Sequence, residues 1–390
     1  MSNIFKEKKQ KLNLQKDLEV LDKSELIEKI VMLEESNKQL KAIINRLNGK
    51  SKDGNTVRKS KKPFNFEKCT KRHILLKFYY LGWDYNGFVV QESINDTIEQ
   101  HLFAALIKSC CIESREISNY HRCGRTDKGV SSFSQVISLD VRSKLSLSDQ
   151  HKLKDELPYC KMLNRLLPSN IRCIEWCPVP STFSARFDCK FRMYKYFFPK
   201  GKLNIDVMDK AIKYTIGEHD FRNICKMDVA NGVTNYKRTV IDANVSLHKP
   251  NFKGIPAYDI CEMNITSHAF LWHQIRCLMG ILLLVGQGKE DPEIILELLD
   301  IVKYPQKPQY NLAHELPLNL WYCKYEPDEW YTDKEEIINT IRTLQKDWTV
   351  NTIKSVMIEN MLSDLESSIN CKDLSFQSDS LLLGVQSKVY

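Results

Sequence analysis

The sequence predicts an α+β fold, in which strands and helices mix without the regular strand–helix–strand order that builds a parallel sheet. Two segments, 74–81 and 135–141, carry the apolar, β-branched and aromatic pattern of buried strands. A third segment, 270–285, has its apolar residues at helical spacing. The chain has 390 residues, which is enough for two domains and a sizeable core. Its composition, 43 % hydrophobic and 27 % charged, is ordinary for a globular protein.

The N-terminal part is expected to be separate from the globular part. It begins with a basic tail at 1–21, and the leucines of residues 22–48 then recur at heptad spacing, at Leu26, Leu33, Leu40 and Leu47. This pattern predicts a coiled-coil helix that self-associates or binds another helix, although one amphipathic helix packed on its own domain also fits. Residues 49–71 form a basic linker, for which a solvated connection, a nuclear-import signal and an auxiliary phosphate-binding arm are all open.

The globular part is predicted to have two halves, 72–180 and 181–330, with Pro178 and Pro180 at the boundary. The first half is expected to contain, in order, a strand at 74–81, a helix at 96–108, a strand at 135–141 and a helix at 156–167. The first of these helices opens with Asp96-Thr-Ile-Glu99, which has the spacing of a capping box.

The second half is expected to contain strands near 190–198 and 257–266 and helices near 206–215, 270–285 and 292–300. Asp291 is a natural N-cap for the last of them, with Pro292 at the first helical position. Residues 331–390 complete the chain with a C-terminal helix and a tail. Beyond about residue 345 the sequence is polar and rich in Ser, and we expect it to be largely mobile.

Charge and cysteine content narrow the class of protein. A net charge of +8 permits a nucleic-acid partner without requiring one. We expect a cytoplasmic or nuclear protein with no membrane contact, because no stretch reaches membrane-spanning length and the N-terminus lacks an apolar signal region. The 13 cysteines are then expected to be reduced thiols.

The sequence also predicts chemistry without a cofactor or a metal. The nearest approach to a Cys-x-x-Cys pair is Cys173 with Cys177, and no Cys/His pair follows it to complete a zinc site. There is no Gly-rich phosphate loop and no dinucleotide-binding fingerprint, and no carboxylate cluster suggests catalytic magnesium.

The segment 121–129 is the most informative one in the chain. A single carboxylate, Asp127, stands among four potential cations, His121, Arg122, Arg125 and Lys128, with Gly124 and Gly129 on either side. Nearby cations keep a carboxyl group ionised, and an ionised Asp suits a nucleophile or an electrostatic stabiliser. The same cations would attract a polyanionic substrate. A solvated turn with a surface ion pair explains the spacing at least equally well.

Two further segments carry groups that could work with Asp127. On a strand, Arg192, Tyr194 and Tyr196 share one face, and aromatic rings beside cations are used to hold unstacked bases; a core strand is the other interpretation. Arg276 lies within the apolar helix, where a buried charge needs a partner. Asp127 is the partner we nominate, unless the arginine reaches solvent instead.

Three motifs in this order resemble those of the TruA-type tRNA pseudouridine synthases. They are Gly124-Arg-Thr-Asp-Lys-Gly129, Arg192-x-Tyr194-x-Tyr196 and Phe270-Leu-Trp-His-Gln-Ile-Arg276, within a resemblance covering roughly residues 72–325. The resemblance implies a fold of two mixed α/β halves with an antiparallel sheet and the active-site cleft between them. It implies that Asp127 is catalytic, that Tyr194 stacks on the target uracil and that Arg276 pairs with Asp127.

The resemblance also implies roles in binding RNA. Arg125 would hold the target nucleotide after it is flipped out of its stack. The other residues expected to contact RNA are His121, Arg122, Lys128, Arg192 and Arg238. The family reaction isomerises uridine to pseudouridine, and Asp127 either attacks C1′ of the sugar or abstracts a sugar proton to give a glycal; both routes stay open.

A narrower resemblance points to the eukaryotic branch that acts at tRNA positions 38 and 39, in the anticodon stem-loop. It is carried by the coiled coil and by residues 118–123 and 219–231. It implies a homodimer with the tRNA lying across both subunits. The alternatives are the same chemistry at other tRNA positions, a non-catalytic tRNA-binding chaperone and a zipper-type DNA-binding protein.

Overall fold

The computed structural model describes residues 64–90, 96–227, 232–250, 258–326 and 329–369, with isolated positions between 27 and 35. The chain divides into two units, Met1–Pro63 and Phe64–Tyr390. In the first unit the described positions are helical and exposed. Most of the predicted coiled coil at 22–48 and residues 49–63 of the predicted linker lie outside the described residues. Residues 64–71 of the predicted linker are described, and they include a 3-10 helix at Phe66–Lys68 and the start of a strand at Thr70.

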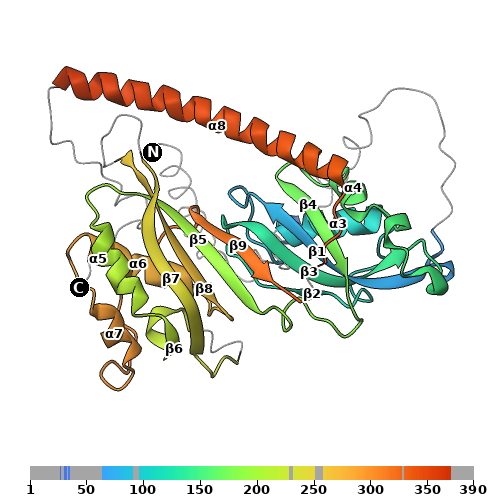
Figure 1. The fold of residues 1–390 in the computed structure, drawn as a ribbon, viewed down its shortest axis with the longest axis horizontal. Coiled ribbons are helices and arrows are strands. Elements are labelled where there is room, and N and C mark those ends of the chain that lie inside the picture. Colours follow the sequence, from blue (N-terminus) through green and yellow to red (C-terminus); the bar gives the residue numbers. More distant parts are fainter. Residues whose placement is uncertain are drawn as a thin grey trace. The chain divides into compact units, whose positions relative to one another are not determined.

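One nine-stranded sheet runs through the described part of the second unit (Figure 1), in the order β4-β1-β3-β9-β5-β8-β7-β6 with β2 paired to β3. The strands are β1 Thr70–Tyr80, β2 His121–Arg122, β3 Ser131–Ser143, β4 Ile171–Pro178, β5 Phe191–Pro199, β6 Gly217–Asp220, β7 Lys237–Lys249, β8 Ile260–Ser267 and β9 Leu318–Lys324. This confirms the α+β class.

The sheet is mixed, which corrects the expectation of antiparallel pairing throughout. The other pairs are antiparallel, but β3 and β9 run parallel through the pairs Ser131–Asn319 and Ser132–Leu320. The predicted boundary at residue 180 falls between β4 and β5, yet both predicted halves contribute strands to the same sheet. The short parallel contact is where they join.

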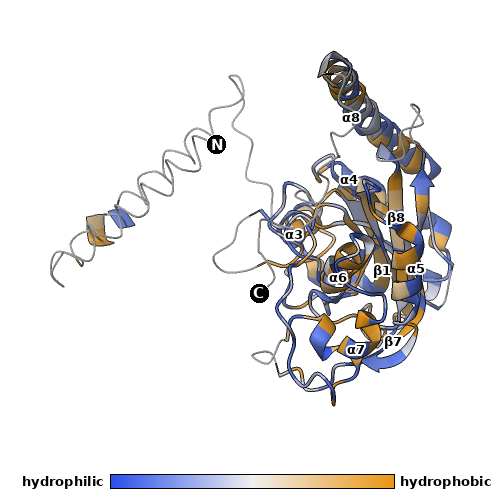
Figure 2. Cartoon of the chain, turned by 90° about the vertical axis from the view of Figure 1, so that its left-hand side faces the viewer, coloured by the Kyte–Doolittle hydropathy of each residue, from blue (hydrophilic) through white to orange (hydrophobic). Residues whose placement is uncertain are grey.

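Helices cover the sheet and build two apolar cores. The helices of this unit are α3 Ile98–Lys108, α4 Tyr159–Asn164, α5 Ile205–Lys213, α6 Gln274–Gly286, α7 Ile294–Leu299 and α8 Lys334–Ile369. Helices α3 and α4 pack with β1, β3 and β4, and α5, α6 and α7 pack with β5, β7, β8 and β9. Figure 2 shows hydrophobic residues along the central strands and on α6, where buried side chains are expected to drive folding.

Helices α4 and α6 begin three and four residues later than predicted, and two other helices have different N-caps from the predicted ones. Asp96 has a φ of 67°, so it cannot cap α3, and the extended Thr97 accepts a hydrogen bond from the backbone N–H of Gln100 in its place. At α7 the N-cap is Glu293, because the carbonyl of Asp291 closes a preceding turn by accepting from the N–H of Ile294. Each misplacement is small and leaves the helix itself correctly predicted.

The C-terminal helix α8 is much longer than predicted. The segment expected to be mobile beyond residue 345 is helical as far as Ile369, and α8 has 36 residues. Its polar, Ser-rich sequence contains no Gly or Pro, so nothing in it interrupts a helix. Buried Glu336 anchors its first turn by accepting a hydrogen bond from Asn164 of α4.

Within the described ranges, none of the helices combines the length and apolar character that crossing a bilayer requires.

Candidate active site

Asp127 lies on a loop between β2 and β3 that is held at several points. The hydroxyl groups of Tyr80 and Thr126 are 2.7 Å apart, and the side chain of Gln135 donates to the carbonyl of Gly124 at 3.2 Å. The N–H of Phe88 also donates to the carbonyl of Thr126 at 3.1 Å. Strands β1 and β3 therefore hold the segment that immediately precedes the carboxylate, as a rigid scaffold fixes functional loops in general.

Only one of the two glycines beside Asp127 is required by the backbone. Gly129 has a φ of 78°, and a Cβ there would lie 2.9 Å from Cγ of Glu315. Gly124 is not in the left-handed region, and a Cβ there would meet no atom within 4 Å. The sequence argument for a shaped loop is confirmed at Gly129 and is wrong at Gly124.

Two basic side chains from the start of α6 contact the Asp127 carboxylate. Its Oδ2 lies 3.1 Å from Nε2 of His273 and 3.5 Å from Nη1 of Arg276. The contact between Asp127 and Arg276 is the one that the buried-charge argument predicted. Arg276 has closer partners as well, since its Nη2 lies 2.8 Å from Oε2 of Glu315 and its Nε donates to the carbonyl of Ala313 at 2.9 Å.

His273 and Glu315 were not among the site residues predicted from the sequence. His273 is the N-cap of α6 and has a φ of 58°, which is uncommon for a residue other than glycine. It precedes Arg276 by three residues, and residues three apart share a helix face, so this signal was available in the sequence. Glu315 gave no such signal, because it lies in a connection before β9 that only the fold brings to Arg276.

The Asp127 carboxyl group is set up to be ionised. Burial alone would raise its pKa, but the hydrogen bond and charge of His273 and the charge of Arg276 lower the pKa below its ordinary value. The side chain is still 30 % exposed, so it stays open to a substrate. The direction agrees with the sequence prediction, but the cause differs: these two cations are distant in sequence, whereas the expected ones were neighbours along the loop.

Comparison with known proteins decides the family. The tRNA pseudouridine synthase family profile matches residues 211–326. The chain is 45 % identical over 362 residues to the human tRNA pseudouridine(38/39) synthase, covering 88 % of this chain and 74 % of the human one. This chain belongs to the tRNA pseudouridine synthase family. It is also 38 % identical over 371 residues to the Saccharomyces cerevisiae tRNA pseudouridine(38/39) synthase, covering 90 % of this chain and 82 % of the yeast one.

A more distant relative is the tRNA pseudouridine synthase A of Methanosarcina barkeri. It is 28 % identical over 292 residues, which cover 74 % of this chain and 98 % of the archaeal protein. The family profile match contains His273, Arg276 and Glu315, whereas Asp127 and Tyr194 precede it. The residues around Asp127 thus come from both the matched segment and the region before it.

Tyr194 of this synthase lies on the buried face of β5. Residues Arg192, Tyr194 and Tyr196 share that face, as predicted, and Tyr194 is 9 % exposed. Its ring meets Phe270 edge to face, with centroids 5.2 Å apart. Phe270 belongs to the same segment as His273 and Arg276, so the packing ties Tyr194 to the segment that contacts Asp127.

Three of the predicted RNA contacts lie on the surface of the loop. Arg125 and Lys128 are exposed, and neither makes an ion pair or side-chain hydrogen bond within the part of the chain that the structure describes. His121 is also exposed, with its ring 6.5 Å from that of Phe187. Phe187 is 75 % exposed and was not anticipated; an exposed aromatic ring beside cations is a suitable stacking surface for a base.

The other predicted RNA contacts are engaged within the protein. Arg122 forms an ion pair with buried Glu99 at 2.7 Å. Arg192 is 9 % exposed, and its guanidinium donates to the backbone carbonyls of Cys123, Arg186 and His268. These placements favour a structural role for both arginines.

Arg238 at the start of β7 is only partly satisfied. Its Nη1 donates to the carbonyls of Asn235 and Lys237, but its Nε is buried and has no hydrogen-bond partner among the described residues. Burial lowers the pKa of Arg238 because no carboxylate is there to oppose the desolvation. An arginine in this state keeps the capacity to bind an anion such as a phosphate.

Proposed function

We propose that this synthase converts uridine to pseudouridine at positions 38 and 39 of tRNA, the positions that the names of its human and yeast relatives state. The observation that carries the proposal is the Asp127 carboxylate, which is kept ionised by His273 and Arg276 while part of it faces solvent. A charged, positioned and accessible oxygen is what either route of the reaction requires.

The proposed reaction needs no external reactant. The bond between C1′ and N1 of the uridine breaks, the uracil turns in the site, and a bond between C1′ and C5 forms. C5 loses one proton and N1 takes up one, so the product is an isomer of the substrate. Asp127 either attacks C1′ or removes a sugar proton to give a glycal, and each role starts from the ionised carboxylate. Arg276 acts as a positioning residue, since its fork spans Asp127, Glu315 and the carbonyl of Ala313.

We assign the substrate contacts to residues of this loop and of strands β2, β5 and β7. Tyr194 would stack on the uracil, and Arg125 would hold the flipped nucleotide. His121, Lys128 and Arg238 would contact the phosphates of the anticodon stem-loop, where exposed or unpaired cations supply most of the affinity.

We also propose a homodimer with the tRNA across both subunits and a coiled coil at 22–48. Sedimentation of the full chain as a monomer at every concentration would contradict the dimer.

The decisive experiment is site-resolved pseudouridine mapping on unmodified tRNA transcripts. Wild type, Asp127→Ala and the control Asp364→Ala, an exposed residue of α8, are compared with matched measurements of tRNA affinity. We expect modification at positions 38 and 39 by wild type and by Asp364→Ala, and none by Asp127→Ala, with nearly equal affinities.

Other outcomes separate the alternatives. Modification at other positions would keep the chemistry and overturn the positions. Tight binding with no modification by the wild type would favour a non-catalytic tRNA chaperone. Parallel loss of binding and activity in Asp127→Ala would give Asp127 a structural role.

A further inference from the structure

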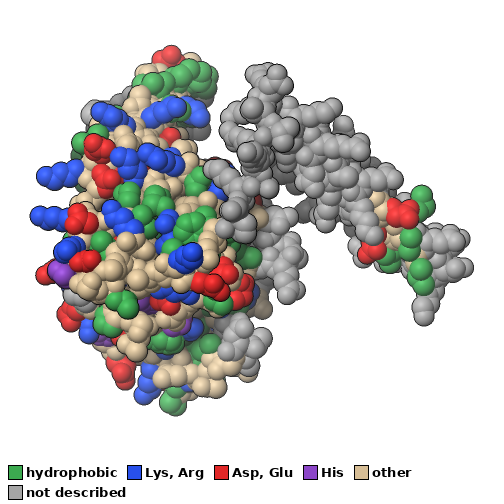
Figure 3. Space-filling view, turned by 90° about the vertical axis from the view of Figure 1, so that its right-hand side faces the viewer, with side chains coloured by type: hydrophobic (Ala, Val, Ile, Leu, Met, Phe, Trp, Pro, Cys, Tyr) green, Lys and Arg blue, Asp and Glu red, His purple; other side chains and the backbone are tan. Residues whose placement is uncertain are grey.

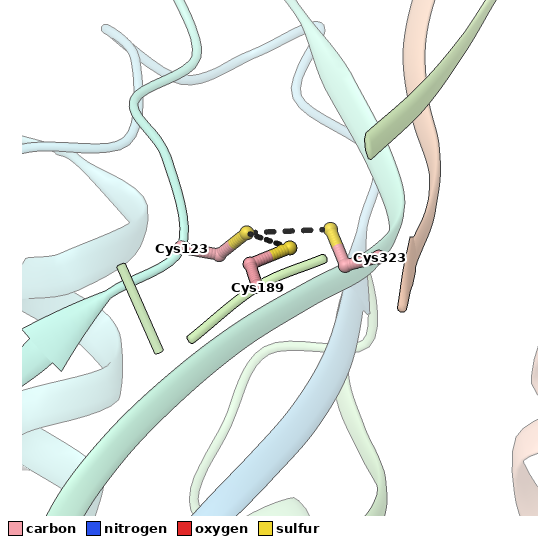
Figure 4. A group of neighbouring side chains, drawn as sticks. All are labelled: Cys123, Cys189 and Cys323. Atoms are coloured by element: carbon pink, nitrogen blue, oxygen red, sulfur yellow. Dashed lines mark hydrogen bonds between the residues drawn. The ribbon is translucent and has the colours of Figure 1, made fainter. Parts of the chain in front are cut away.

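Three buried cysteines from distant parts of the chain meet behind the Asp127 loop. Sγ of Cys123 lies 3.7 Å from Sγ of Cys189 and 3.5 Å from Sγ of Cys323. Figure 4 shows the three side chains pointing toward one another, and their sulfur atoms all lie within 4.8 Å of each other. They are 4 %, 8 % and 2 % exposed, respectively. Cys173 and Cys177, the nearest approach to a Cys-x-x-Cys pair in the sequence, do not belong to this group.

The sulfur geometry fits one metal ion at the centre of the group. Zinc–thiolate bonds are about 2.3 Å long, so two thiolates on a tetrahedral zinc are separated by roughly 3.8 Å. The observed separations of 3.5 Å and 3.7 Å are already close to that value. The three side chains therefore need to move little to become ligands, which is the expected state of a pre-organised site.

A permanent positive charge lies next to the three sulfur atoms. Arg192 lies beside the group, because its Nη2 donates to the carbonyl of Cys123 at 3.1 Å and it pairs with Cys323 across β5 and β9. Zinc ligands must be deprotonated, so a cation here promotes binding.

We propose that Cys123, Cys189 and Cys323 form a binding site for a single zinc ion. Three thiolates, one divalent ion and the Arg192 guanidinium sum to zero charge, which is the condition under which a buried ionic group is least costly. Binding forms three Zn–S bonds, and the remaining S–H protons leave to solvent without any transfer of electrons. The hydroxyl of Tyr325 lies beside Cys123 and donates to the carbonyl of Ala185 at 2.6 Å, and its oxygen is one candidate for a fourth position.

The proposed ion would position the active-site loop. Cys123 precedes Asp127 by four residues, Cys189 leads into β5 and Cys323 lies on β9. The ion would tie the start of the loop to two strands of the other half of the molecule. It touches none of the groups assigned to the reaction, so its contribution is to the order of the loop and to stability.

The test measures metal in the purified full-length chain. Mass spectrometry of elements should find about one zinc per chain, and cobalt exchanged into the site should give sulfur-to-cobalt charge-transfer absorption. Cys189→Ser and Cys323→Ser should each lose most of the bound metal and lower Tm. The control Cys160→Ser removes an equally buried thiol from the other core cluster and should keep the metal.

Two results would overturn the proposal. One is wild-type protein that contains no stoichiometric metal and gives no cobalt spectrum while its thiols are reduced. The other is a disulfide between two of the three cysteines in protein isolated under thiol-blocking conditions. Both readouts are made on the wild type, so they hold even if a variant fails to fold. Neither depends on pseudouridine formation, so the metal proposal and the proposed function can fail separately.

Discussion

Two basic side chains, Arg276 and His273, hold Asp127, and they differ in charge and in hydrogen bonding. Arg276 carries a permanent charge on a planar fork that also reaches Glu315 and Ala313, whereas His273 offers one ring nitrogen at 3.1 Å. The arginine therefore fixes where the carboxylate lies, and the histidine adds a hydrogen bond that favours its charged form. Substitutions at the two positions should have different signatures.

Removal of His273 should move the acid limb of the pH–rate profile. The pKa of Asp127 is lowered chiefly by His273, so activity should persist until the pH falls through that lowered value. In His273→Asn the pKa of Asp127 should rise toward its ordinary value, and the loss of activity should begin at higher pH. The measurement is single-turnover pseudouridine formation against pH, with exposed His151→Asn as the control. An acid limb that does not move would remove His273 from this role.

Arg276→Lys should reduce turnover without weakening tRNA binding. A lysine keeps the charge but cannot span Asp127, Glu315 and the carbonyl of Ala313 at once. The loss of one charge-assisted hydrogen bond of about 1.5–3 kcal/mol corresponds to a decrease of roughly 10-fold to 150-fold. Single-turnover rates and equilibrium tRNA binding are compared, with exposed Arg342→Lys on α8 as the control. An equal loss of affinity would place Arg276 in substrate binding.

Among the elements, the loop before β3 requires glycine at one of its two glycine positions. Gly129 adopts a φ of 78° and lies against Glu315, whereas Gly124 has open space around its Cα. The two positions look equivalent in the sequence, which gives no information on φ. Gly129→Ala should lower stability by about 1 kcal/mol or more from backbone strain and displace the partner of Arg276. Gly124→Ala should be close to neutral.

The glycine prediction is checked by thermal unfolding and turnover of the two variants side by side. A lower Tm and a lower rate are expected for Gly129→Ala alone. Equal effects in both variants would mean that the loop relaxes freely around residue 129.

Elements with strong local patterns were predictable, and those that depend on distant partners were not. Strands β1, β3 and β5 and helices α3 and α6 have periodic apolar residues, which the sequence alone displays. The end of α8 was missed because a polar segment without Gly or Pro is compatible with both a helix and a mobile tail. In the site, the contact between Asp127 and Arg276 followed from the need to pair a buried charge, while Glu315 could be found only from the fold.

At the scale of the whole molecule, the two halves of the sheet are joined by one short pairing between strands that are far apart in the sequence. Strand β9 pairs with β3 on one side and β5 on the other, and its link to β3 consists of two residue pairs. No local signal marks such a link, because β9 is about 180 residues away from β3. The site nevertheless depends on this link, because Asp127 precedes β3 in the first half while its basic partners His273 and Arg276 come from α6 in the second half.

Charge is dispersed on the face of the molecule that Figure 3 presents. The net charge is +8, but Figure 3 shows acidic and basic side chains interleaved on the face it presents. A dispersed charge attracts tRNA weakly, so specific phosphate contacts should carry the affinity. Arg125 and Lys128 are the candidates on the Asp127 loop, because both are exposed and neither is paired within the described residues.

Affinity for tRNA should therefore depend on salt through these residues. Each phosphate contact releases counterions, so Lys128→Ala should weaken binding and reduce the slope of log K against log salt by about one. The control Lys354→Ala removes an exposed lysine from α8, far along the chain from the loop, and should leave the slope unchanged. Fluorescence anisotropy of labelled tRNA at a series of salt concentrations gives both slopes. An unchanged slope in Lys128→Ala would mean that the tRNA backbone does not lie along the Asp127 loop, and equal changes in both variants would mean that the dispersed charge dominates.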